Sequence, residues 1–418
     1  MKILLKNGNI VTDKVEKGSL LVEDGIIKDI AASIEGVQQI VDCEGKYIVP
    51  GLIDMHVHLR EPGLEYKETL ASGAEGAIHG GLTTICCMAN TAPVIDTSSI
   101  VSWVRRRSDE IGMADILPFA CVTKQMQGEE LTEMGDLLQA GACGFSDDGK
   151  PVNSSEVMRR ALEYSRHFGA FISAHEEDLK LANGGFIHEG KISTEYGFRG
   201  IPAESESVMV ARDIEIARLT GGHVHICHVS SRHSLKMIQR AKEDGINVTA
   251  EVTHNHLTFT DELCKSYNTN TKNNPPLRAE EDRLLLLDGI KKGYIDCLVS
   301  DHAPHHKDDK FKEYDYASFG MTGLQTIVPA LLKLIADGAL TWQDFVRITA
   351  TNPAKILKLA NKGQLAKGGI ADIAIIDPEQ TYVYNETVNK SLSFNTPFWG
   401  QTLKGKAVQV LKGGRLML

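Results

Sequence analysis

The chain has 418 residues, of which 42% are hydrophobic and 24% are charged, and its formal net charge is −10. This balance is ordinary for a globular protein. The sequence has no run of Lys and Arg that could track a phosphate backbone, which argues against nucleic acid as a partner.

No uninterrupted apolar segment reaches transmembrane length, and the opening residues 1–6 are too short and too polar for a signal peptide. We therefore expect a cytoplasmic protein that has no membrane partner. Several of the eight cysteines fall inside apolar, strand-like runs, and none has the paired spacing of a zinc ribbon. This pattern predicts reduced core thiols and no disulfide framework.

Residues 1–50 alternate short β-like runs with turn signals such as Asn7-Gly8 and Asp24-Gly25. Asn-Gly and Asp-Gly pairs between apolar runs are strong hairpin signals. After about residue 365 the helical period fades and β-like runs return, with Gly413-Gly414 as a hairpin turn. The two ends, 1–50 and 365–418, are therefore expected to form one small β-sandwich.

Residues 51–364 alternate apolar strand-like runs with amphipathic helical ones. The eight expected strands lie near 51–58, 82–89, 115–122, 141–147, 170–175, 222–228, 246–253 and 295–301. The expected helices span 68–79, 98–111, 129–140, 155–168, 205–219, 234–244, 280–292 and 324–336. This alternation predicts an α/β fold, a (β/α)8 TIM-like barrel. Thr341 and Asp344 have the spacing of a capping box, which predicts one further helix.

His56 and His58 end the first expected strand one pleat apart, so their side chains project from the same face. Alone, the pair is also compatible with two half-buried strand histidines. Other candidate ligands follow the ends of other strands: Asp147 or Asp148, His175, His228 and Asp301. Strand ends converge on one rim of a barrel, and imidazoles with carboxylates suit zinc, so we expect two Zn²⁺ per chain. Four more histidines fit either a supporting role or plain structure: His223, His225, His254 and His256.

The chain resembles the class I bacterial dihydroorotases of the amidohydrolase superfamily over essentially its whole length. The resemblance rests on the motifs Asp54-Met-His56-Val-His58-Leu-Arg60-Glu-Pro-Gly63, Met88-Ala-Asn90-Thr, Phe145-Ser-Asp-Asp148-Gly, His175-Glu-Glu-Asp, His225-Ile-Cys-His228-Val-Ser, Asn274-Pro-Pro-Leu-Arg278 and Ser300-Asp301-His302-Ala-Pro-His305. The Asp-x-His-x-His core alone indicates only the superfamily. Together the motifs are highly specific.

The resemblance implies a role for each matching metal ligand. The first metal would be held by His56, His58 and Asp301, the second by His175 and His228, and Asp148 would bridge the two. Many relatives bridge their metals with a carbamylated lysine, where this chain reads Gly-Phe-Ser-Asp-Asp-Gly. The choice of Asp148 over Asp147 stays open, because strand alternation does not decide it.

The resemblance also implies a substrate site. Arg60, Asn90 and His305 match positions that bind a substrate carboxylate, which a guanidinium fork can grip through two hydrogen bonds. Asn274 and the backbone of Phe319 and Gly320 would contact the edges of a pyrimidine ring. The Asn274-Pro-Pro sequence can also be read as a rigid loop without a ligand.

The implied reaction is the reversible hydrolysis of (S)-dihydroorotate to N-carbamoyl-L-aspartate in pyrimidine biosynthesis, with Asp301 as the proton carrier. The same-fold alternative is a hydantoinase or allantoinase, whose neutral substrates offer the carboxylate cradle nothing to hold. A non-catalytic dihydroorotase-like partner of aspartate carbamoyltransferase is the other alternative, although such homologues lose metal ligands and this chain retains them.

Two further expectations concern assembly and the rim. We expect a homodimer, while the residues do not decide whether the chain associates with aspartate carbamoyltransferase. The stretch 183–205, between the fifth and sixth strands, is too long for an ordinary connection. It is expected to cover the site or a subunit contact.

Overall fold

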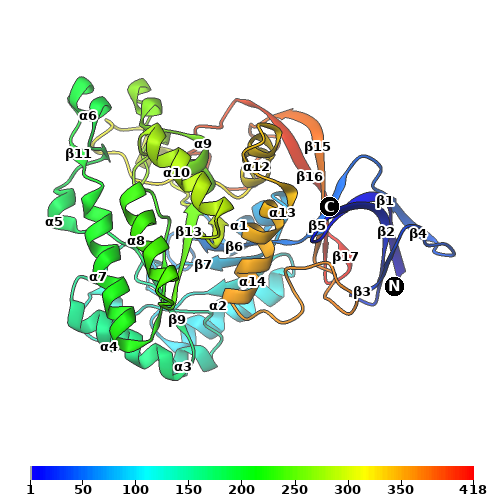
Figure 1. The fold of residues 1–418 in the computed structure, drawn as a ribbon, viewed down its shortest axis with the longest axis horizontal. Coiled ribbons are helices and arrows are strands. Elements are labelled where there is room, and N and C mark those ends of the chain that lie inside the picture. Colours follow the sequence, from blue (N-terminus) through cyan, green and yellow to red (C-terminus); the bar gives the residue numbers. More distant parts are fainter. Residues whose placement is uncertain (1) are drawn as a thin grey trace.

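The computed structural model describes residues 2–418. An α/β barrel fills one side of the molecule, and a β-rich unit built from both chain ends packs beside it (Figure 1). Among the described residues, no helix combines the length and the apolar character needed to cross a bilayer.

The β-rich unit is one eight-stranded sheet. Its strands are β1 (Lys2–Val11), β2 (Val15–Glu23), β3 (Ile26–Ala31), β4 (Gln39–Asp42), β5 (Tyr47–Pro50), β15 (Ile373–Val383), β16 (Thr402–Lys412) and β17 (Arg415–Leu416). They run in the order β17-β16-β15-β5-β1-β2-β3, with β4 beside β1. The antiparallel pairing of β5 with β15 joins the two chain ends. Buried side chains such as Ile3, Ile27 and Ile373 give this unit a core of its own.

One expected turn of this unit is wrong. Strand β1 continues through Asn7-Gly8 to Val11, and its register with β2 shifts between Leu5 and Gly8. Asn7 has φ 63°, a left-handed conformation that Asn tolerates better than most residues. The pair therefore marks a β-bulge inside a long strand.

The barrel strands are β6 (Leu52–Val57), β7 (Leu82–Cys87), β8 (Asp115–Pro118), β9 (Phe171–Ala174), β12 (His223–Ile226), β13 (Val248–Thr253) and β14 (Cys297–Val299). They form two parallel runs, β6-β7-β8 and β14-β13-β12-β9. A parallel bridge between Val57 and His302 joins the two runs on one side. Phe145 bridges Ala120 and Ile172 on the other, so the ring of strands closes.

The strand expected at 141–147 is therefore reduced to the bridges of Phe145. The residues after it use side chains where a strand would use its backbone. The carboxylate of Asp147 accepts hydrogen bonds from the backbone N–H groups of Val122 and Thr123 at 2.8 and 3.2 Å. These donors are thereby satisfied without a regular ladder.

Eight helices cover the barrel: α1 (Leu70–His79), α2 (Ser98–Ile111), α3 (Met134–Gln139), α4 (Ser155–His167), α7 (Glu204–Thr220), α8 (Arg232–Glu243), α10 (Glu280–Lys291) and α12 (Ile327–Ala336). They match the expected series except that α3 begins only at Met134. Just before it, the Thr132 hydroxyl donates to the carbonyl of Cys121 at 2.7 Å. This hydrogen bond ties the stretch before α3 to the segment that follows β8. The capping box of Thr341 and Asp344 is confirmed and opens α13 (Trp342–Val346).

The remaining elements are short. They are η1 (Lys124–Met126), α5 (Leu179–Ala182), β10 (Ile187–His188), α6 (Lys191–Tyr196), β11 (Gly200–Ile201), α9 (His254–Thr258), η2 (Asp261–Ser266), η3 (Thr269–Thr271), α11 (Lys307–Lys310), η4 (Arg347–Thr351) and α14 (Asn352–Ile356). Most of them lie in loops on the rim where the barrel strands end. Phe198, between α6 and β11, packs on Phe186, Tyr267 and Tyr314 with ring centroids 4.8–5.7 Å apart. The rim loops after β9, β13 and β14 thus share one aromatic cluster.

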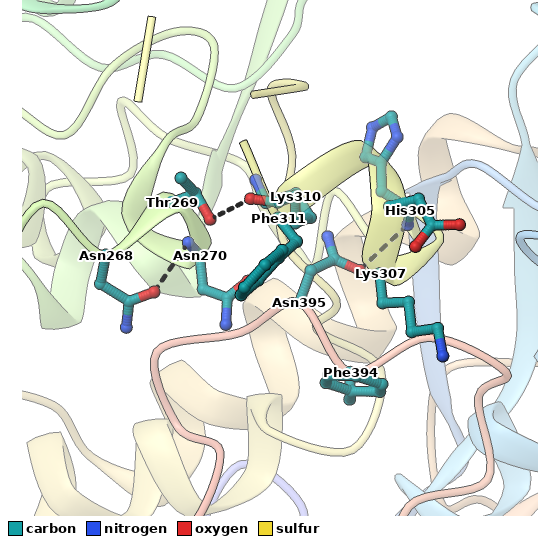
Figure 2. A pocket seen from close by; sticks show the side chains of 10 residues that line it. Asn268, Thr269, Asn270, His305, Lys307, Lys310, Phe311, Phe394 and Asn395 are labelled. Carbon is teal, nitrogen blue, oxygen red and sulfur yellow. Dashed lines mark hydrogen bonds between the residues drawn. The ribbon is translucent and has the colours of Figure 1, made fainter. Parts of the chain in front are cut away.

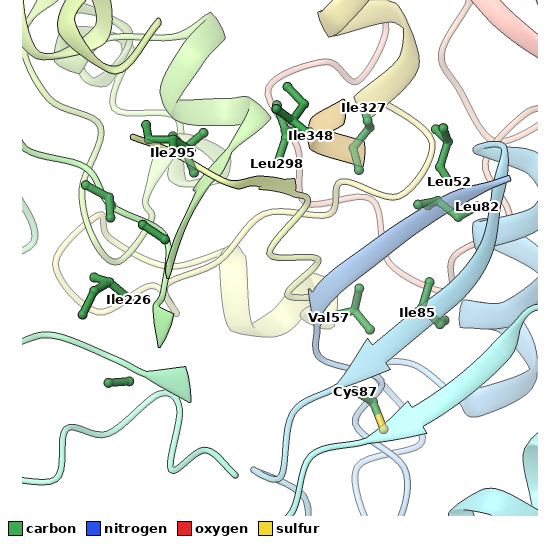
Figure 3. Close-up of a cluster of buried hydrophobic side chains, with 14 of the residues drawn as sticks. Leu52, Val57, Leu82, Ile85, Cys87, Ile226, Ile295, Leu298, Ile327 and Ile348 are labelled. Atoms are coloured by element: carbon green, nitrogen blue, oxygen red, sulfur yellow. The ribbon is translucent and has the colours of Figure 1, made fainter. Parts of the chain in front are cut away.

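The barrel core holds the strand ends in place. Every residue of β6 and β7 is buried, as expected for parallel strands covered on both faces. Figure 3 shows Val57, Ile85 and Leu298 within this buried cluster, close to the ends of their strands. A rigid core beneath the rim is what allows side chains from distant segments to meet with defined geometry.

Candidate active site

Six polar side chains meet where the barrel strands end. They are His56 and His58 at the end of β6, Asp148 beyond the Phe145 bridges, His175 after β9, His228 after β12 and Asp301 after β14. Each is at most 6% exposed. The structure therefore brings together all the residues that the sequence nominated as metal ligands.

The six side chains form two groups that share Asp148. The potential ligand atoms of His56, His58 and Asp301 lie within 4.8 Å of one another, and so do those of Asp148, His175 and His228. Oδ2 of Asp148 is 3.4 Å from Nε2 of both His56 and His58. Oδ1 is 3.1 Å from Nδ1 of His175 and from Nε2 of His228. One carboxylate thus presents one oxygen to each group.

Hydrogen bonds outside the cluster set how the imidazoles face it. Nδ1 of His56 lies 2.6 Å from Oε1 of Glu251, and Nδ1 of His58 lies 2.9 Å from Oδ1 of Asn90. Because these oxygens accept hydrogen bonds, each Nδ1 carries a proton and each Nε2 faces the cluster. His175 is reversed, since its Nε2 pairs with Glu177 at 3.2 Å. Imidazoles that bind metals are characteristically oriented by such partners.

The cluster fits a metal centre. Nε2 of His56 is buried and has no hydrogen-bond partner among the described residues. Nδ1 of His175 faces Nε2 of His228 at only 3.0 Å. Imidazole lone pairs and carboxylate oxygens that converge in this way match borderline divalent cations.

Charge within the cluster shifts its pKa values in opposite directions. Burial would raise the pKa of Asp148, but the surrounding imidazoles of His56, His175 and His228 hold it well below its usual range. Burial would lower the pKa of His56, yet the carboxylates of Asp148 and Glu251 raise it well above its usual range. For His58, burial dominates and lowers the pKa.

The backbone bends sharply at three of the site residues. His228, Asp301 and Arg60 have φ values of 32°, 48° and 62°. Residues with a Cβ rarely adopt this left-handed region, and such strain tends to concentrate at functional sites. Two of these bends follow barrel strands directly and aim the side chain at the cluster.

A cavity of about 250 Å³ opens over the cluster. Besides five of the six cluster residues and Gly149, its walls are Arg60, Asn90, Asn273, Asn274, Ala303, His305, Phe319 and Gly320. His56, fully buried, lies beneath it. All residues predicted to bind substrate therefore line the same cavity.

The predicted carboxylate-binding residues differ in what they can offer a ligand. Burial lowers the pKa of Arg60 to about 10, so it remains a cation near neutral pH, and its Nε donates to the carbonyl of Pro304 at 3.2 Å. Burial and the nearby cations Arg60 and Lys67 lower the pKa of His305 to about 2, which leaves it neutral. Since His58 engages the oxygen of Asn90, the amide nitrogen is the group that Asn90 can offer.

Asp147 and Asp148 point to different places. Asp147 turns away from the cluster toward the backbone of Val122 and Thr123. Asp148 lies among the four imidazoles. The sequence left open which of the two aspartates faces the other candidate ligands. Their positions differ, because only Asp148 lies within the cluster.

Two buried carboxylates at the site escaped the sequence reasoning. Glu251, on β13, contacts His56, Nε2 of His225 at 3.1 Å and the backbone N–H of His228 at 3.3 Å. Glu177 accepts from Nδ2 of Asn274 at 3.0 Å as well as pairing with His175. For Glu251 a signal existed, because it is the only charged residue of an otherwise strand-like run.

The four histidines of undecided role have distinct surroundings. His223 and His225 each lie 2.8 Å from the hydroxyl of Thr249, and His225 also supports Glu251. His256 pairs with the carbonyl of Pro275 at 3.1 Å, next to the cavity residue Asn274. His254 pairs with Thr326 at 2.8 Å.

Solved structures define the class of this fold. The L-hydantoinase (dihydropyrimidinase) from Arthrobacter aurescens superposes with a TM-score of 0.88 at 24% identity and covers 99% of this chain and 95% of that one. The dihydropyrimidinase from Brevibacillus agri NCHU1002 superposes with a TM-score of 0.85 at 22% identity, with 100% and 95% coverage. The chain therefore has the fold of these hydantoinase and dihydropyrimidinase structures.

Sequence comparison narrows this class to a family. A family model described as Dihydro-orotase-like matches residues 45–234. A protein named Dihydroorotase from Syntrophus aciditrophicus (strain SB) is 46% identical over 100% of this chain and 99% of its own length. Another of that name, from Caldanaerobacter subterraneus subsp. tengcongensis, is 44% identical over 100% and 97%. The chain belongs to the dihydroorotase family.

Proposed function

We propose that the chain is an active dihydroorotase that catalyses the reversible hydrolysis of (S)-dihydroorotate to N-carbamoyl-L-aspartate. The observation that carries this proposal is one cavity that unites a cluster of metal-binding character with a buried cation. Arg60 lines this cavity together with the neutral side chains of His305 and Asn90, which suits an anionic cyclic amide.

We assign the cluster two zinc ions. The first would be held by His56, His58 and Asp301, and the second by His175 and His228, with Asp148 between them. When bound, such cations polarise a ring carbonyl and make water acidic enough to act as a nucleophile near neutral pH.

Asp301 is the proposed proton carrier. Its Oδ1 lies 3.3 Å from Nε2 of His58. Burial would raise its pKa, but the hydrogen bond from His58 and the charge of His56 lower it. The carboxylate form can accept a proton from the attacking water and return it to the departing ring nitrogen. Ring closure requires the protonated form, so hydrolysis should strengthen as pH rises and cyclisation as pH falls.

The remaining cavity residues orient the substrate. Arg60 pairs with its carboxylate, and the amide of Asn90 and the neutral imidazole of His305 complete that cradle. Asn274 donates its amide protons to Glu177, so its oxygen can accept from a ring N–H. The backbone of Phe319 and Gly320 lies along the other ring edge.

Arg60→Ala tests the substrate assignment. Losing one partner of a buried charge pair costs about 2–5 kcal/mol, or roughly 30- to 4,000-fold in kcat/KM for dihydroorotate. Activity on dihydrouracil, which lacks the carboxylate, should be low and nearly unaffected. Arg105→Ala is the control, because Arg105 likewise donates to a backbone carbonyl, that of Ile116, but far from the cavity. Full dihydroorotate turnover by Arg60→Ala would favour a hydantoinase-type substrate.

The complete donor set supports an enzyme over a non-catalytic partner of aspartate carbamoyltransferase. We also propose a cytoplasmic location, which suits eight cysteines that are all free, and a homodimer, which light scattering can test. Association with aspartate carbamoyltransferase is a question for co-purification.

A further inference from the structure

Asn395 reaches the wall of the substrate cavity from outside the succession of barrel strands and helices. It belongs to the segment between β15 and β16, which also contacts the barrel through Glu68 and Gln325. Its side chain is only 2% exposed. Figure 2 shows it beside His305, joined to the backbone of that residue.

All three strong hydrogen bonds of this amide go to one rim loop, the loop that follows β14. Oδ1 accepts from the backbone N–H of His305 at 3.0 Å. Nδ2 donates to the carbonyls of Ala303 and Gly320, each at 3.0 Å. The Asn395 carbonyl accepts from the N–H of Thr322 at 2.9 Å. One side chain therefore spans both arms of the loop that forms this wall of the cavity.

The first arm carries the carboxylate-binding residues. Asn395 grips Ala303 and His305, the residues on either side of Pro304. The Pro304 carbonyl in turn accepts from Nε of Arg60 at 3.2 Å. The position of the guanidinium and that of the His305 ring therefore depend on the same amide.

The second arm carries the ring-edge residues. The Gly320 carbonyl accepts from Asn395 and also from the buried ammonium of Lys310 at 3.1 Å. Gly320 has φ +130°, and a Cβ at this position would lie 2.7 Å from that of Ala303. The two arms therefore pack closely against each other, and both carry residues that line the cavity.

We propose that Asn395 is a positioning residue that fixes the substrate-binding half of the site relative to the metal-binding half. It holds Arg60, His305 and the Phe319-Gly320 backbone in one arrangement without touching the reacting atoms. Its predicted kinetic effect rests on the proposed function, whereas its effect on the loop does not.

Asn395→Leu keeps the approximate volume and removes all three hydrogen bonds. The KM for dihydroorotate should rise about 10- to 100-fold, because misplaced binding groups cost about this much. The kcat should change less, and the metal content per chain should stay the same. In the same variant, hydrogen–deuterium exchange across residues 302–321 should become faster without any substrate present.

The matched control is Asn389→Leu. Asn389 lies in the same segment and donates to the carbonyls of Ser391 and Ser393 at 2.8 and 3.1 Å. Its loss should lower thermal stability but leave KM and the exchange of 302–321 near wild type. Equal effects of the two variants would mean that the segment is merely loosened, and would overturn the positioning role.

The two readouts separate this inference from the proposed function. If wild-type protein fails to open dihydroorotate, the proposed function is wrong, yet faster exchange in Asn395→Leu would still support the positioning role. Unchanged exchange and unchanged KM would overturn it. Should Asn395→Leu fail to fold, Asn395→Asp replaces it, since that variant keeps the shape and the Oδ1 acceptor but sets an oxygen against two carbonyls.

Discussion

At the scale of single residues, the site depends on a carboxylate that is as deeply buried as the most buried ligand, His56. Glu251 is 0% exposed, orients the ring of His56 and accepts from the backbone of His228. It therefore reaches a member of each ligand group. Burial would raise its pKa, but the charge of His56 and hydrogen bonds from His225 and His56 lower it, which keeps it an acceptor.

Glu251→Gln should weaken metal binding about 10- to 100-fold, the usual cost of losing a partner that orients a metal-binding histidine. The measurement is metal retained per chain during titration with a competing chelator. Glu243→Gln serves as a control, because Glu243 pairs with Tyr294 at 3.2 Å on the outside of the barrel. Unchanged affinity in Glu251→Gln would contradict the assigned role of Glu251.

A second prediction concerns Lys310, a buried lysine whose Nζ donates to the carbonyls of Ser318 and Gly320. Burial and Lys272 lower its pKa from 10.5 to about 7, against the opposing charge of Asp309. Between these two values the unfolded chain binds more protons, so this group makes stability rise with pH. Relative to wild type, Lys310→Met should thus be most stable below pH 7 and lose that advantage toward pH 10.5.

The measurement is the difference in unfolding midpoint between Lys310→Met and wild type from about pH 6 to about pH 9. Other titrating groups cancel in this difference. A constant difference across that range would show that burial does not lower the pKa of Lys310 in the folded protein.

Sequence reasoning found the site residues that have an informative sequence pattern around them. Each nominated ligand follows an apolar strand-like run, and barrel topology then brings such ends together. Glu251 and Asn395 were missed because their partners are distant in sequence: Glu251 lies 195 residues from His56, and Asn395 lies 90 residues from His305. Asn90 shows a subtler limit, because its side chain supports His58 as well as lining the cavity.

At the scale of elements, the predictions were most accurate where the side-chain period or a capping motif is clear. Helix α2 has the expected bounds, and the Thr341 capping box forms. The fourth barrel strand failed because Asp147 satisfies backbone donors with its carboxylate, which no periodicity reveals. The Asn7-Gly8 pair failed because a bulge and a turn use the same left-handed residues.

Thr341→Ala should lower the free energy of unfolding by about 1 kcal/mol, the usual effect of removing an N-cap. Its hydroxyl accepts from the N–H of Asp344 at 3.1 Å. Thr97 is the matched control, since it occupies the same position before α2 with extended backbone but without a cap hydrogen bond from its side chain. Equal losses of unfolding free energy in Thr341→Ala and Thr97→Ala would show that the capping box makes no specific contribution to stability.

At the scale of the whole molecule, a closed barrel and a rigid rim bring distant segments to one point. Residues from β6 to the loop after β14 supply the cluster, and the segment before β16 reaches back to the cavity through Asn395. The fold class and the joining of the chain ends were readable from the alternation of periods along the sequence. The aromatic cluster of the rim loops was not, because it forms only once three loops fold together.

The most direct test follows the opening of the dihydroorotate ring by purified protein before and after chelation, with zinc content measured in parallel. The account predicts turnover in the metal-loaded protein, loss of nearly all of it when the metal is removed, and recovery when zinc is restored. Undiminished turnover by protein shown to be metal-free would contradict the claim that this cluster performs the chemistry.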